Sequence, residues 1–483
     1  MKKVIISILV VLSIFVTSSS WAQELQSKSA AGLAASNAGR ENFYPSGTSP
    51  DAKLPALPKG PLLLSGTASE QLSPDYWINR LPNPDRILKT PEQLKFFNKE
   101  IRMMIHERVD IFQAGVLPSG TQIRNQIKLE YETISKRKLF NVNDQYIPKD
   151  VFPTQIKPLV QWEQVPSTMT IKWGAATRAT SVRALPTTMK MLEEKGDIEF
   201  DQLQFTLIKL WTPVAVFHTS TDGKWYYVQA PYVRGWVRAR DIAIFPSRKA
   251  LQEKAGSDSF LAVTGESVPV CFDPNCQEVF QSPSMGTILP LVRKTEAAYV
   301  VEMPLRASSG KVILKNYYVQ TSSDVSKGFL SFTQRNIIRQ AFKLLSARYG
   351  WGGMYYGRDC SGFTHDVFLS LGVDLPRDSD QQAMSGTQLG HFEPHEDADT
   401  KTAVLMEAAP GVTFLKMPLH MMLYLGEVDG RFYVIHSTWA ERISMDSDEK
   451  NRINQVVVSD LSLNGRSYLG SLFDRTISIN ELD

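Results

Sequence analysis

The stretch that decides the fold is Asp359-Cys360-Ser361-Gly362-Phe363. It follows a glycine-rich aromatic segment, Tyr349-Gly350-Trp351-Gly352-Gly353, and precedes apolar residues at helical spacing that end before Gly372. This pattern predicts a loop that feeds a helix, with Cys360 in the first turn. Because a helix N-terminus presents unpaired N–H groups and partial positive charge, we expect a lowered thiol pKa and a nucleophilic thiolate.

Length and composition set the class of protein. The chain has 483 residues, of which 43% are hydrophobic and 21% charged, so we expect a multidomain globular protein. The formal net charge is only +3, which gives no reason to expect a nucleic-acid partner. After the first 25 or so residues no apolar run is long enough to span a bilayer, so we expect no stable membrane insertion. We expect a monomer.

The N-terminus has the pattern of an export signal. Lys2-Lys3 precede a short apolar run, and Ser20-Trp21-Ala22 offers a cleavage site after residue 22. Residues 23–72 are rich in Ser, Ala, Gly and Pro, which predicts a disordered linker. We therefore expect a periplasmic or secreted protein.

Export makes the three cysteines informative. Cys271 and Cys276 flank the turn sequence Asp273-Pro274-Asn275, so they can close a small disulfide loop, although free thiols remain an alternative. In either case Cys360 is left over, and a leftover cysteine in an exported protein is a candidate reactive thiol.

The mature chain is predicted to contain four folded units. The sequence Thr90-Pro91-Glu92-Gln93 starts a helix in the first of them. Strand patterns and tight turns then predict small barrels, and Asp222-Gly223-Lys224-Trp225 with Gly235-Trp236-Val237 resembles bacterial SH3-like domains of cell-wall enzymes. Any other small barrel remains the alternative. The predicted boundaries are 73–155 (helical), 156–250 (SH3-like), 251–327 (a second, weaker SH3-like match) and 328–483.

A thiol nucleophile needs a base and a group that orients the base. His365 lies roughly 140° around the helix from Cys360, so we expect a structural or surface role for it. His391 and His395 sit in an acidic, proline-containing stretch that we interpret as a solvated loop and not a metal site. We expect no metal and no cofactor.

His420 and His436 each lie on a strand pattern, and Val428-Asp429-Gly430 between them signals a hairpin turn. A two-residue Asp429-Gly430 turn would place His436 opposite Leu423, on the other face from His420. A three-residue turn pairs Glu427 with Arg431 and places both rings on one face. We predict the three-residue turn.

Together these motifs resemble the NlpC-type family of bacterial cell-wall cysteine peptidases. The resemblance rests on Asp-Cys-Ser-Gly-Phe at a helix start, the strand His420–Gly426, and Ile435-His436-Ser437. It implies a papain-like α+β core in residues 328–483, with a helix carrying the cysteine packed on an antiparallel sheet carrying the histidine. The expected fold class is therefore α+β multidomain, with two SH3-like barrels and a helical N-terminal domain before the peptidase.

The resemblance also implies residue roles. Cys360 matches the nucleophile, His420 the general base and His436 the residue that orients it. Tyr349 matches an oxyanion and substrate residue, Asp359 and Ser361 match contacts to the stem peptide, and Arg377-Asp378-Ser379 resembles a segment lining the cleft. By position alone, Asp201 and Tyr232 are the nearest matches to residues that read the free amine of an N-terminal L-alanine. The segment Gly411-Val412 lacks the acidic residue found there in many members, and Lys416-Met417-Pro418 intervenes before His420.

The implied activity is hydrolysis of peptidoglycan or murein stem peptides at the γ-D-glutamyl–diamino acid bond, for wall remodelling or peptide recycling. Two alternatives stay open at this point: a non-catalytic wall-binding protein, and an amidase or acyltransferase on the same core.

Overall fold

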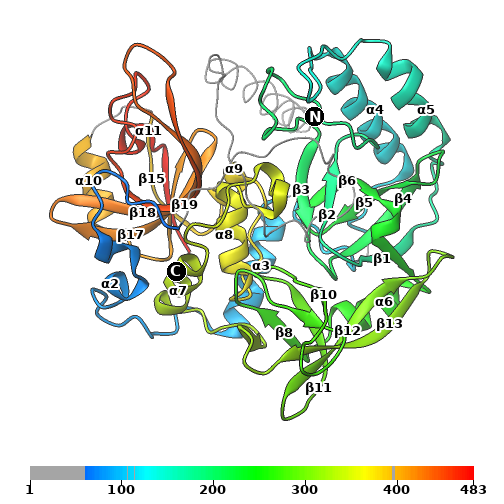
Figure 1. Ribbon diagram of the computed structural model, residues 1–483, viewed down its shortest axis with the longest axis horizontal. Coiled ribbons are helices and arrows are strands. Elements are labelled where there is room, and N and C mark those ends of the chain that lie inside the picture. Colours follow the sequence, from blue (N-terminus) through cyan, green and yellow to red (C-terminus); the bar gives the residue numbers. More distant parts are fainter. Residues whose placement is uncertain (1–59, 106, 114, 394–397, 483) are drawn as a thin grey trace, which may run out of the picture.

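The computed structural model describes residues 60–482 except 106, 114 and 394–397. Three antiparallel sheets organise the chain, and Figure 1 shows two of them at the right and bottom and the third at the left. The predicted export signal and residues 23–59 of the predicted linker lie outside the described residues. Within the described ranges, no helix is both long and apolar enough to cross a membrane.

The helices before the first sheet divide between two cores. Thr90 caps its helix as predicted, since its Oγ1 accepts a hydrogen bond from the Gln93 N–H and the Gln93 side-chain oxygen accepts one from the Thr90 N–H. Helices α2 and α3 pack into the core of the C-terminal domain, whereas α4 packs against the first sheet. The predicted unit 73–155 therefore has no separate core in this structure. The bounds are α2 (Pro74–Ile78), α3 (Pro91–Met104), α4 (Gly120–Lys136) and α5 (Lys157–Val160).

The first sheet is a curled antiparallel sheet in the order β3-β2-β6-β5-β4-β1-β7. The turn at Thr221-Asp222-Gly223 joins β4 to β5, as its sequence predicts, and Trp225 and Trp236 are buried in the core that this sheet shares with α4. Its strands are β1 (Lys172–Ala176), β2 (Thr180–Arg183), β3 (Gln204–Ile208), β4 (Pro213–Thr219), β5 (Trp225–Ala230), β6 (Val233–Arg238) and β7 (Ile242–Phe245).

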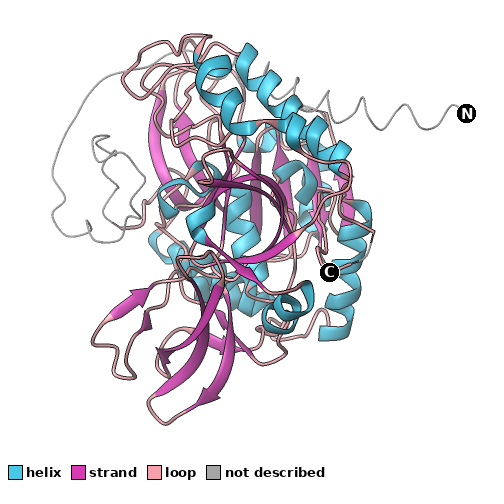
Figure 2. Ribbon diagram, turned by 90° about the vertical axis from the view of Figure 1, so that its right-hand side faces the viewer, coloured by secondary structure: helices cyan, strands magenta, loops and turns pink. Residues whose placement is uncertain are grey.

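Helix α6 (Arg248–Ala255) leads into a second curled sheet, in the order β10-β9-β13-β12-β11-β8-β14. Figures 1 and 2 both place this sheet at the lower end of the molecule. Cys271 and Cys276 form a disulfide at its edge, which confirms that pairing, and Cys360 is free and buried. The strands are β8 (Phe260–Val263), β9 (Val270–Cys271), β10 (Val279–Gln281), β11 (Ile288–Lys294), β12 (Ala298–Arg306), β13 (Val312–Gln320) and β14 (Val325–Lys327).

The C-terminal domain has helices packed on a six-stranded sheet in the order β15-β20-β16-β17-β18-β19. Helices α7 and α8 cover one face, and α10 with the C-terminal loops covers the other. This is the α+β core expected from the sequence. Its elements are α7 (Gln334–Lys343), α8 (Cys360–Leu369), α9 (Ser379–Gln382), β15 (Thr387–His391), α10 (Ala398–Glu407), β16 (Thr413–Met417), β17 (His420–Val428), β18 (Arg431–Arg442), β19 (Lys450–Asp460), α11 (Leu472–Arg475) and β20 (Ser478–Glu481).

The end of the predicted linker is ordered in this structure. Leu64 is buried in the core on the α10 face of the sheet, and the Gly66 carbonyl accepts a hydrogen bond from the Tyr433 hydroxyl at 3.1 Å. The prediction of disorder was therefore wrong for residues 60–72. The prediction failed because Leu62 and Leu64 pack on an apolar surface formed by distant residues, which the composition of this segment alone does not reveal.

Candidate active site

Cys360 is the first residue of α8, as the sequence predicts. Asp359 caps this helix, because its Oδ1 accepts the Gly362 N–H at 2.8 Å. The thiol lies against the start of β17, where Sγ is 3.9 Å from the carbonyl oxygen of Leu419 and also meets the Met421 N–H. These two backbone groups bracket His420, so the fold brings the thiol and the predicted base to one place.

The expected direction of the thiol pKa was wrong. Burial, followed by the neighbouring charge of Asp359, raises the pKa of Cys360 to about 12, and the N–H of Met421 only partly offsets this. The thiol is 7% exposed, so desolvation of the thiolate outweighs the helix terminus. In this closed site Cys360 is a neutral thiol, and its proton has to leave as it attacks.

The glycine-rich segment before Cys360 lets the first sheet come close. Gly352 and Gly353 have φ values of +54° and +78°, and a Cβ on them would lie 2.8 Å from Gln204 Cγ and 3.0 Å from the side chain of Leu207. The Gln204 amide donates to the Gly352 carbonyl at 2.9 Å. The Trp-Gly-Gly sequence is therefore a docking point for β3 as well as a turn.

The predicted three-residue turn between β17 and β18 was wrong. Val428 pairs with Arg431, so Asp429 and Gly430 form a two-residue turn, both with positive φ. The register then shifts between Tyr424 and Gly426, a bulge in β17 that the turn signal cannot reveal. Beyond it Leu423 pairs with Ile435, and continuing that register places His436 opposite Met422.

The bulge brings the two histidines onto one face. His420 Nε2 and His436 Nδ1 are 2.7 Å apart, and His436 Nε2 lies 3.1 Å from the Ser459 hydroxyl on β19. When His420 Nε2 carries the hydrogen, its Nδ1 is left as an acceptor for the thiol proton. Burial and then the neighbouring His436 hold the pKa of His420 well below its usual range, and burial lowers the pKa of His436 to about 3, so both rings are neutral. Ser459 had no motif of its own and follows only from the sheet register.

Arg377 holds the residues on either side of Cys360. Its guanidinium donates to Asp359 Oδ2 at 2.7 Å, to the Ser361 hydroxyl at 3.0 Å and to the Thr206 hydroxyl of β3 at 2.8 Å. Asp359 Oδ2 also accepts the Gly352 N–H at 2.8 Å. Asp359 and Ser361 thus lie at the site as expected, with their side chains engaged in fixing its shape.

Tyr349 is buried near Cys360 and Asp359, and burial, followed by its electrostatic interaction with these two residues, raises its pKa well above the usual range. Phe200, from the first sheet's domain, packs against Tyr349, Trp351 and Trp439, with ring centroids 5.3–6.2 Å apart. This aromatic cluster walls one side of the site, and its member from the first sheet's domain was not expected from the sequence.

The acidic residue that meets the C-terminal domain is Glu199 and not Asp201. The Glu199 carboxylate accepts from Arg348 and Trp439 at 2.8 and 2.9 Å. Asn454 donates to it at 3.0 Å, and Arg452 lies at the same distance. Glu199 lies in an Ile-Glu-Phe stretch with no distinguishing motif.

Asp201 is 1% exposed and faces inward, bonded to Arg183 at 2.8 Å and to the N–H groups of Met191 and Leu203. Tyr232 packs edge-on against His365, and its hydroxyl lies 3.4 Å from the Leu207 carbonyl. Within the described residues, the contacts of these two side chains do not include Cys360 or Tyr349, so the structure does not bring them together with the nucleophile.

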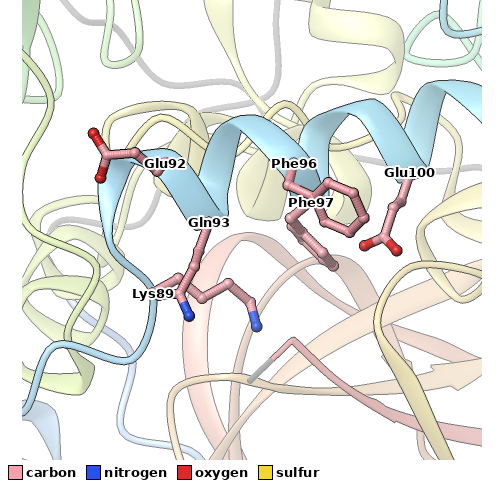
Figure 3. Close-up of a pocket in the computed structure, with 6 residues that line it drawn as sticks. All are labelled: Lys89, Glu92, Gln93, Phe96, Phe97 and Glu100. Atoms are coloured by element: carbon pink, nitrogen blue, oxygen red, sulfur yellow. The ribbon is translucent and has the colours of Figure 1, made fainter.

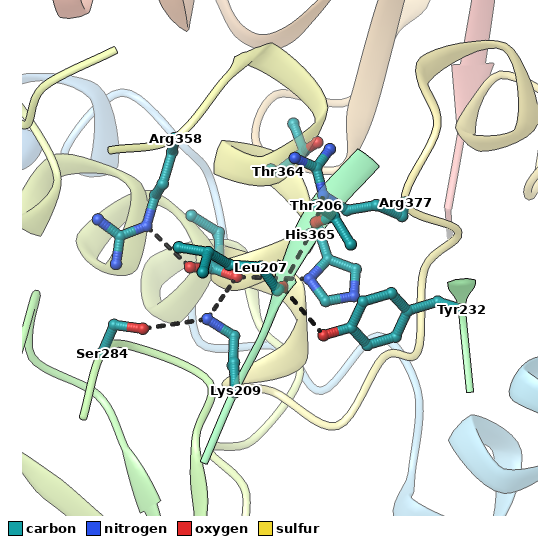
Figure 4. Close-up of polar contacts among 12 residues, drawn as sticks. Thr206, Leu207, Lys209, Tyr232, Ser284, Arg358, Thr364, His365 and Arg377 are labelled. Carbon is teal, nitrogen blue, oxygen red and sulfur yellow. Dashed lines mark hydrogen bonds and ion pairs between the residues drawn. The ribbon is translucent and has the colours of Figure 1, made fainter. Parts of the chain in front are cut away.

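His365 belongs to a buried ionic cluster on the far side of α8, which fits a structural role. Burial raises the pKa of Asp366, but Lys209 at 2.8 Å, the His365 bond and Arg358 at 2.8 Å together hold it below its usual range. Figure 4 shows Lys209 reaching this cluster and Ser284, with Tyr232 beside the His365 ring. The cluster joins both curled sheets to the helix that begins at Cys360.

A separate pocket of about 400 Å³ lies on α3 and is lined by Lys89, Glu92, Gln93, Phe96, Phe97 and Glu100 (Figure 3). None of these residues belongs to the site around Cys360. Among the residues that the structure describes, no group of three histidine, cysteine or acidic side chains has a metal-binding arrangement.

Comparisons with known proteins agree with this architecture. Residues 190–238 match the family model for an SH3 domain of SH3b1 type, and residues 346–462 match that of the NlpC/P60 family. A solved structure described as an NlpC/P60 endopeptidase from Photobacterium damselae subsp. piscicida shares the fold with a TM-score of 0.68. It is 17% identical, and the match covers 89% of this chain and 98% of that one.

Two curated relatives are each named gamma-D-glutamyl-L-lysine dipeptidyl-peptidase. The one from Bacillus cereus is 26% identical over 193 residues, and the one from Bacillus subtilis is 31% identical over 104 residues. The matches cover 38% and 21% of this chain, and the chain spans only 52% and 32% of these relatives' lengths. Cys360, His420 and His436 thus lie inside the range that matches the NlpC/P60 family model, and the range that matches the SH3 domain of SH3b1 type precedes it in the chain.

Proposed function

We propose that this chain is a cysteine endopeptidase that hydrolyses peptidoglycan stem peptides at the bond between γ-D-glutamate and a diamino acid, meso-diaminopimelate. The observation that carries the proposal is the chain of groups from the Cys360 thiol past His420 and His436 to Ser459. The names of the two Bacillus relatives support the γ-D-glutamyl bond.

The reaction begins with the neutral Cys360 thiol and the neutral His420 imidazole. His420 Nδ1 removes the Cys360 proton as Sγ attacks the γ-glutamyl carbonyl, and His436 and Ser459 hold the imidazole in the tautomer that allows this. The carbonyl oxygen becomes an oxyanion, for which the Cys360 N–H and the Tyr349 hydroxyl are the candidate donors. Such a donor contributes on the order of 3 kcal/mol to the transition state.

Collapse of the oxyanion breaks the C–N bond, and the imidazolium of His420 gives its proton to the leaving amine. A thioester between Cys360 and the glutamyl group remains. Water, deprotonated by His420, then attacks the thioester, and the carboxylic acid and the free thiol are released. All proton transfers run through groups of this chain, with no external cofactor.

The first sheet's domain suits a substrate with a free N-terminus, since Phe200 and Glu199 close the site beside Tyr349. Recognition of an L-alanine amine by Asp201 and Tyr232 stays a prediction, and for Asp201 it requires release from Arg183. We further propose the domain limits 156–250, 251–327 and 328–483, export after cleavage at residue 22, a periplasmic or secreted location and a monomeric state. The use of the enzyme in wall remodelling or peptide recycling is part of the same proposal.

The test is digestion of purified peptidoglycan and of L-Ala-γ-D-Glu-meso-diaminopimelate, with Cys360→Ala as control. We expect the dipeptide L-Ala-D-Glu and free diaminopimelate by mass spectrometry, with no product from the variant. Binding without cleavage would favour a wall-binding protein. Products cut at another amide, or transferred to an added amine, would favour the amidase or acyltransferase reading.

A further inference from the structure

Lys416 is a buried cation beside the nucleophile to which the mechanism gives no task. It lies on β16 opposite Met421, the residue whose N–H meets the Cys360 sulfur. Lys416 is only 3% exposed, and its charge acts to lower the pKa of Cys360 against the larger effect of burial. A buried ammonium is costly unless a partner is provided, so its position calls for an explanation.

The partner of Lys416 is on the surface. Its Nζ pairs with Asp380 Oδ1 at 2.8 Å, and the Asp380 side chain is 57% exposed. An ion pair with one member in water contributes little to stability, because water screens the exposed carboxylate. This pair is therefore a weak structural device and is well placed to exchange partners with a charged ligand.

The backbone that carries the pair is held in place relative to the thiol. Asp380 belongs to α9, which Gln382 fixes to the first turn of α8 by donating to the Ser361 carbonyl at 2.9 Å and accepting from Thr364 at 2.6 Å. Lys416 is fixed by its strand pairing with Met421. The two backbone segments that carry the charges are therefore fixed relative to α8, while the charged ends can turn toward a ligand.

The donors of Lys416 are only partly used. An ammonium has three N–H donors, and among the described residues two of them go to Asp380 and to the Met417 carbonyl. One donor is left for a carboxylate, and Asp380, with its exposed face, can accept an ammonium. Together they match a side chain that ends in both an ammonium and a carboxylate.

We propose that Lys416 and Asp380 form the subsite for the zwitterionic end of the diamino acid side chain, and so favour diaminopimelate over lysine. This inference rests on the proposed function, because the diamino acid is the leaving residue of that reaction. Diaminopimelate presents an ammonium to Asp380 and a carboxylate to Lys416, whereas lysine presents only the ammonium. Leu419, whose side chain is exposed, lies at the turn between β16 and β17, and its carbonyl oxygen is 3.9 Å from the Cys360 Sγ.

The test measures kcat/KM of the full chain on three peptides that differ in the last residue only: L-Ala-γ-D-Glu followed by meso-diaminopimelate, L-lysine or L-norleucine. We expect the wild type to cleave them in that order of preference. Lys416→Met should reduce the preference for diaminopimelate over lysine about tenfold, the effect of losing one charge-assisted hydrogen bond. Asp380→Asn should reduce both charged peptides relative to norleucine.

Lys401→Met is the matched control. Lys401 is equally buried, but it lies on α10 at the other face of the sheet, where its Nζ donates to the carbonyls of Phe473 and Asp474. Its replacement should leave the ratios between the peptides unchanged. Cleavage of the norleucine peptide at the wild-type rate serves as the folding check for each variant.

Three results would overturn the inference. If Lys416→Met slows all three peptides by one factor, the lysine acts on the glutamyl part or on the fold. If the wild type cleaves the peptides but neither variant changes their ratios, the subsite lies elsewhere while the proposed function stands. If the wild type cleaves none of the three, the proposed function fails and this inference fails with it.

Discussion

The two curled sheets have similar strand orders but meet the catalytic domain in different ways. The first sheet's domain reaches the loop around Cys360 through Glu199, Gln204 and Thr206; the Gln204 contact is buried and the other two are partly buried. The second sheet touches the back of α8, where Gly286 faces Leu369. It also makes a half-exposed ion pair between Asp324 and Lys343 at 2.7 Å.

This difference separates two roles for similar folds. A domain that supplies a wall of the site must hold its contacts to well under an ångström, whereas one that supports a helix from behind can move without disturbing the reacting atoms. We therefore expect the first sheet to affect the reaction and the second to affect mainly stability.

The largest effect is expected for Glu199→Ala. It removes the carboxylate that four donors of the catalytic domain share, and it frees Phe200 from its place against Tyr349. A misplacement of about 1 Å at an active site costs on the order of 100-fold. We expect a loss of that size in kcat/KM on L-Ala-γ-D-Glu-meso-diaminopimelate.

Asp324→Ala is the counterpart in the second sheet, because it removes an ion pair of similar length that is partly exposed. It should change kcat/KM less than twofold. Circular dichroism checks that both variants are folded. Equal losses in the two variants would show that the sheets do not differ in role.

The next effect is expected for Gly353→Ala. A side chain at φ +78° costs about 1–2 kcal/mol, and the new methyl would press on Leu207 of the first sheet, 3.0 Å away. We expect about a tenfold loss in kcat/KM. Gly223→Ala carries the same strain at φ +69° with open space around it, so it should lower stability but not activity. A similar loss of activity in both variants would mean that strain alone, and not the approach of β3, is responsible.

A smaller effect concerns pH. Because burial and His436 lower the pKa of His420, the imidazole stays neutral and able to accept a proton below pH 6.5. The acid limb of kcat/KM in the wild type should therefore lie below pH 6.5. Loosening the first sheet by Glu199→Ala admits water and moves this limb toward 6.5, which at the limit is roughly a fourfold relative loss at pH 6.

The second-sheet variant Asp324→Ala should keep the wild-type pH limb. The measurement is kcat/KM from pH 5 to 8, with each variant compared with its own maximum. An acid limb at or above pH 6.5 in the wild type would contradict the view that burial from water lowers the pKa of His420.

The sequence predicts the parts of this molecule that depend on local pattern. The helix start at Cys360, the strands around Trp225 and Trp236, and the strands of His420 and His436 follow from spacing and turn residues. The sequence predicted that the two histidines share a face, but it attributed this to a three-residue turn, whereas the cause is a bulge in β17. The type of a turn depends on its own residues, whereas a bulge such as that near Gly426 depends on packing across the sheet.

The sequence could not reveal the contacts between domains. Glu199, Lys209 and Asp366 are ordinary charged residues until two distant segments meet. Asp201 was named by its position and Glu199 was not considered, because position along the chain does not tell which of two nearby carboxylates faces the partner domain. The predicted direction of the Cys360 pKa shift was wrong for a similar reason. Burial of the thiol comes from the tertiary fold, whereas the helix start can be recognised from the local sequence.

The smallest effect on the reaction is expected for the double variant Cys271→Ala, Cys276→Ala. The disulfide closes a short loop, which the Asp273 carboxylate also holds by accepting the N–H groups of Asn275 and Gln277 at 2.9 Å. Closing so short a loop stabilises the fold by about 2 kcal/mol. Thermal unfolding should occur at a lower temperature, while kcat/KM should change less than twofold, because the described contacts of this loop stay within the second sheet's domain. A loss of activity as large as that of Gly353→Ala would mean that the second sheet also sets the geometry around Cys360. The two sheets would then not differ in their effect on the reaction.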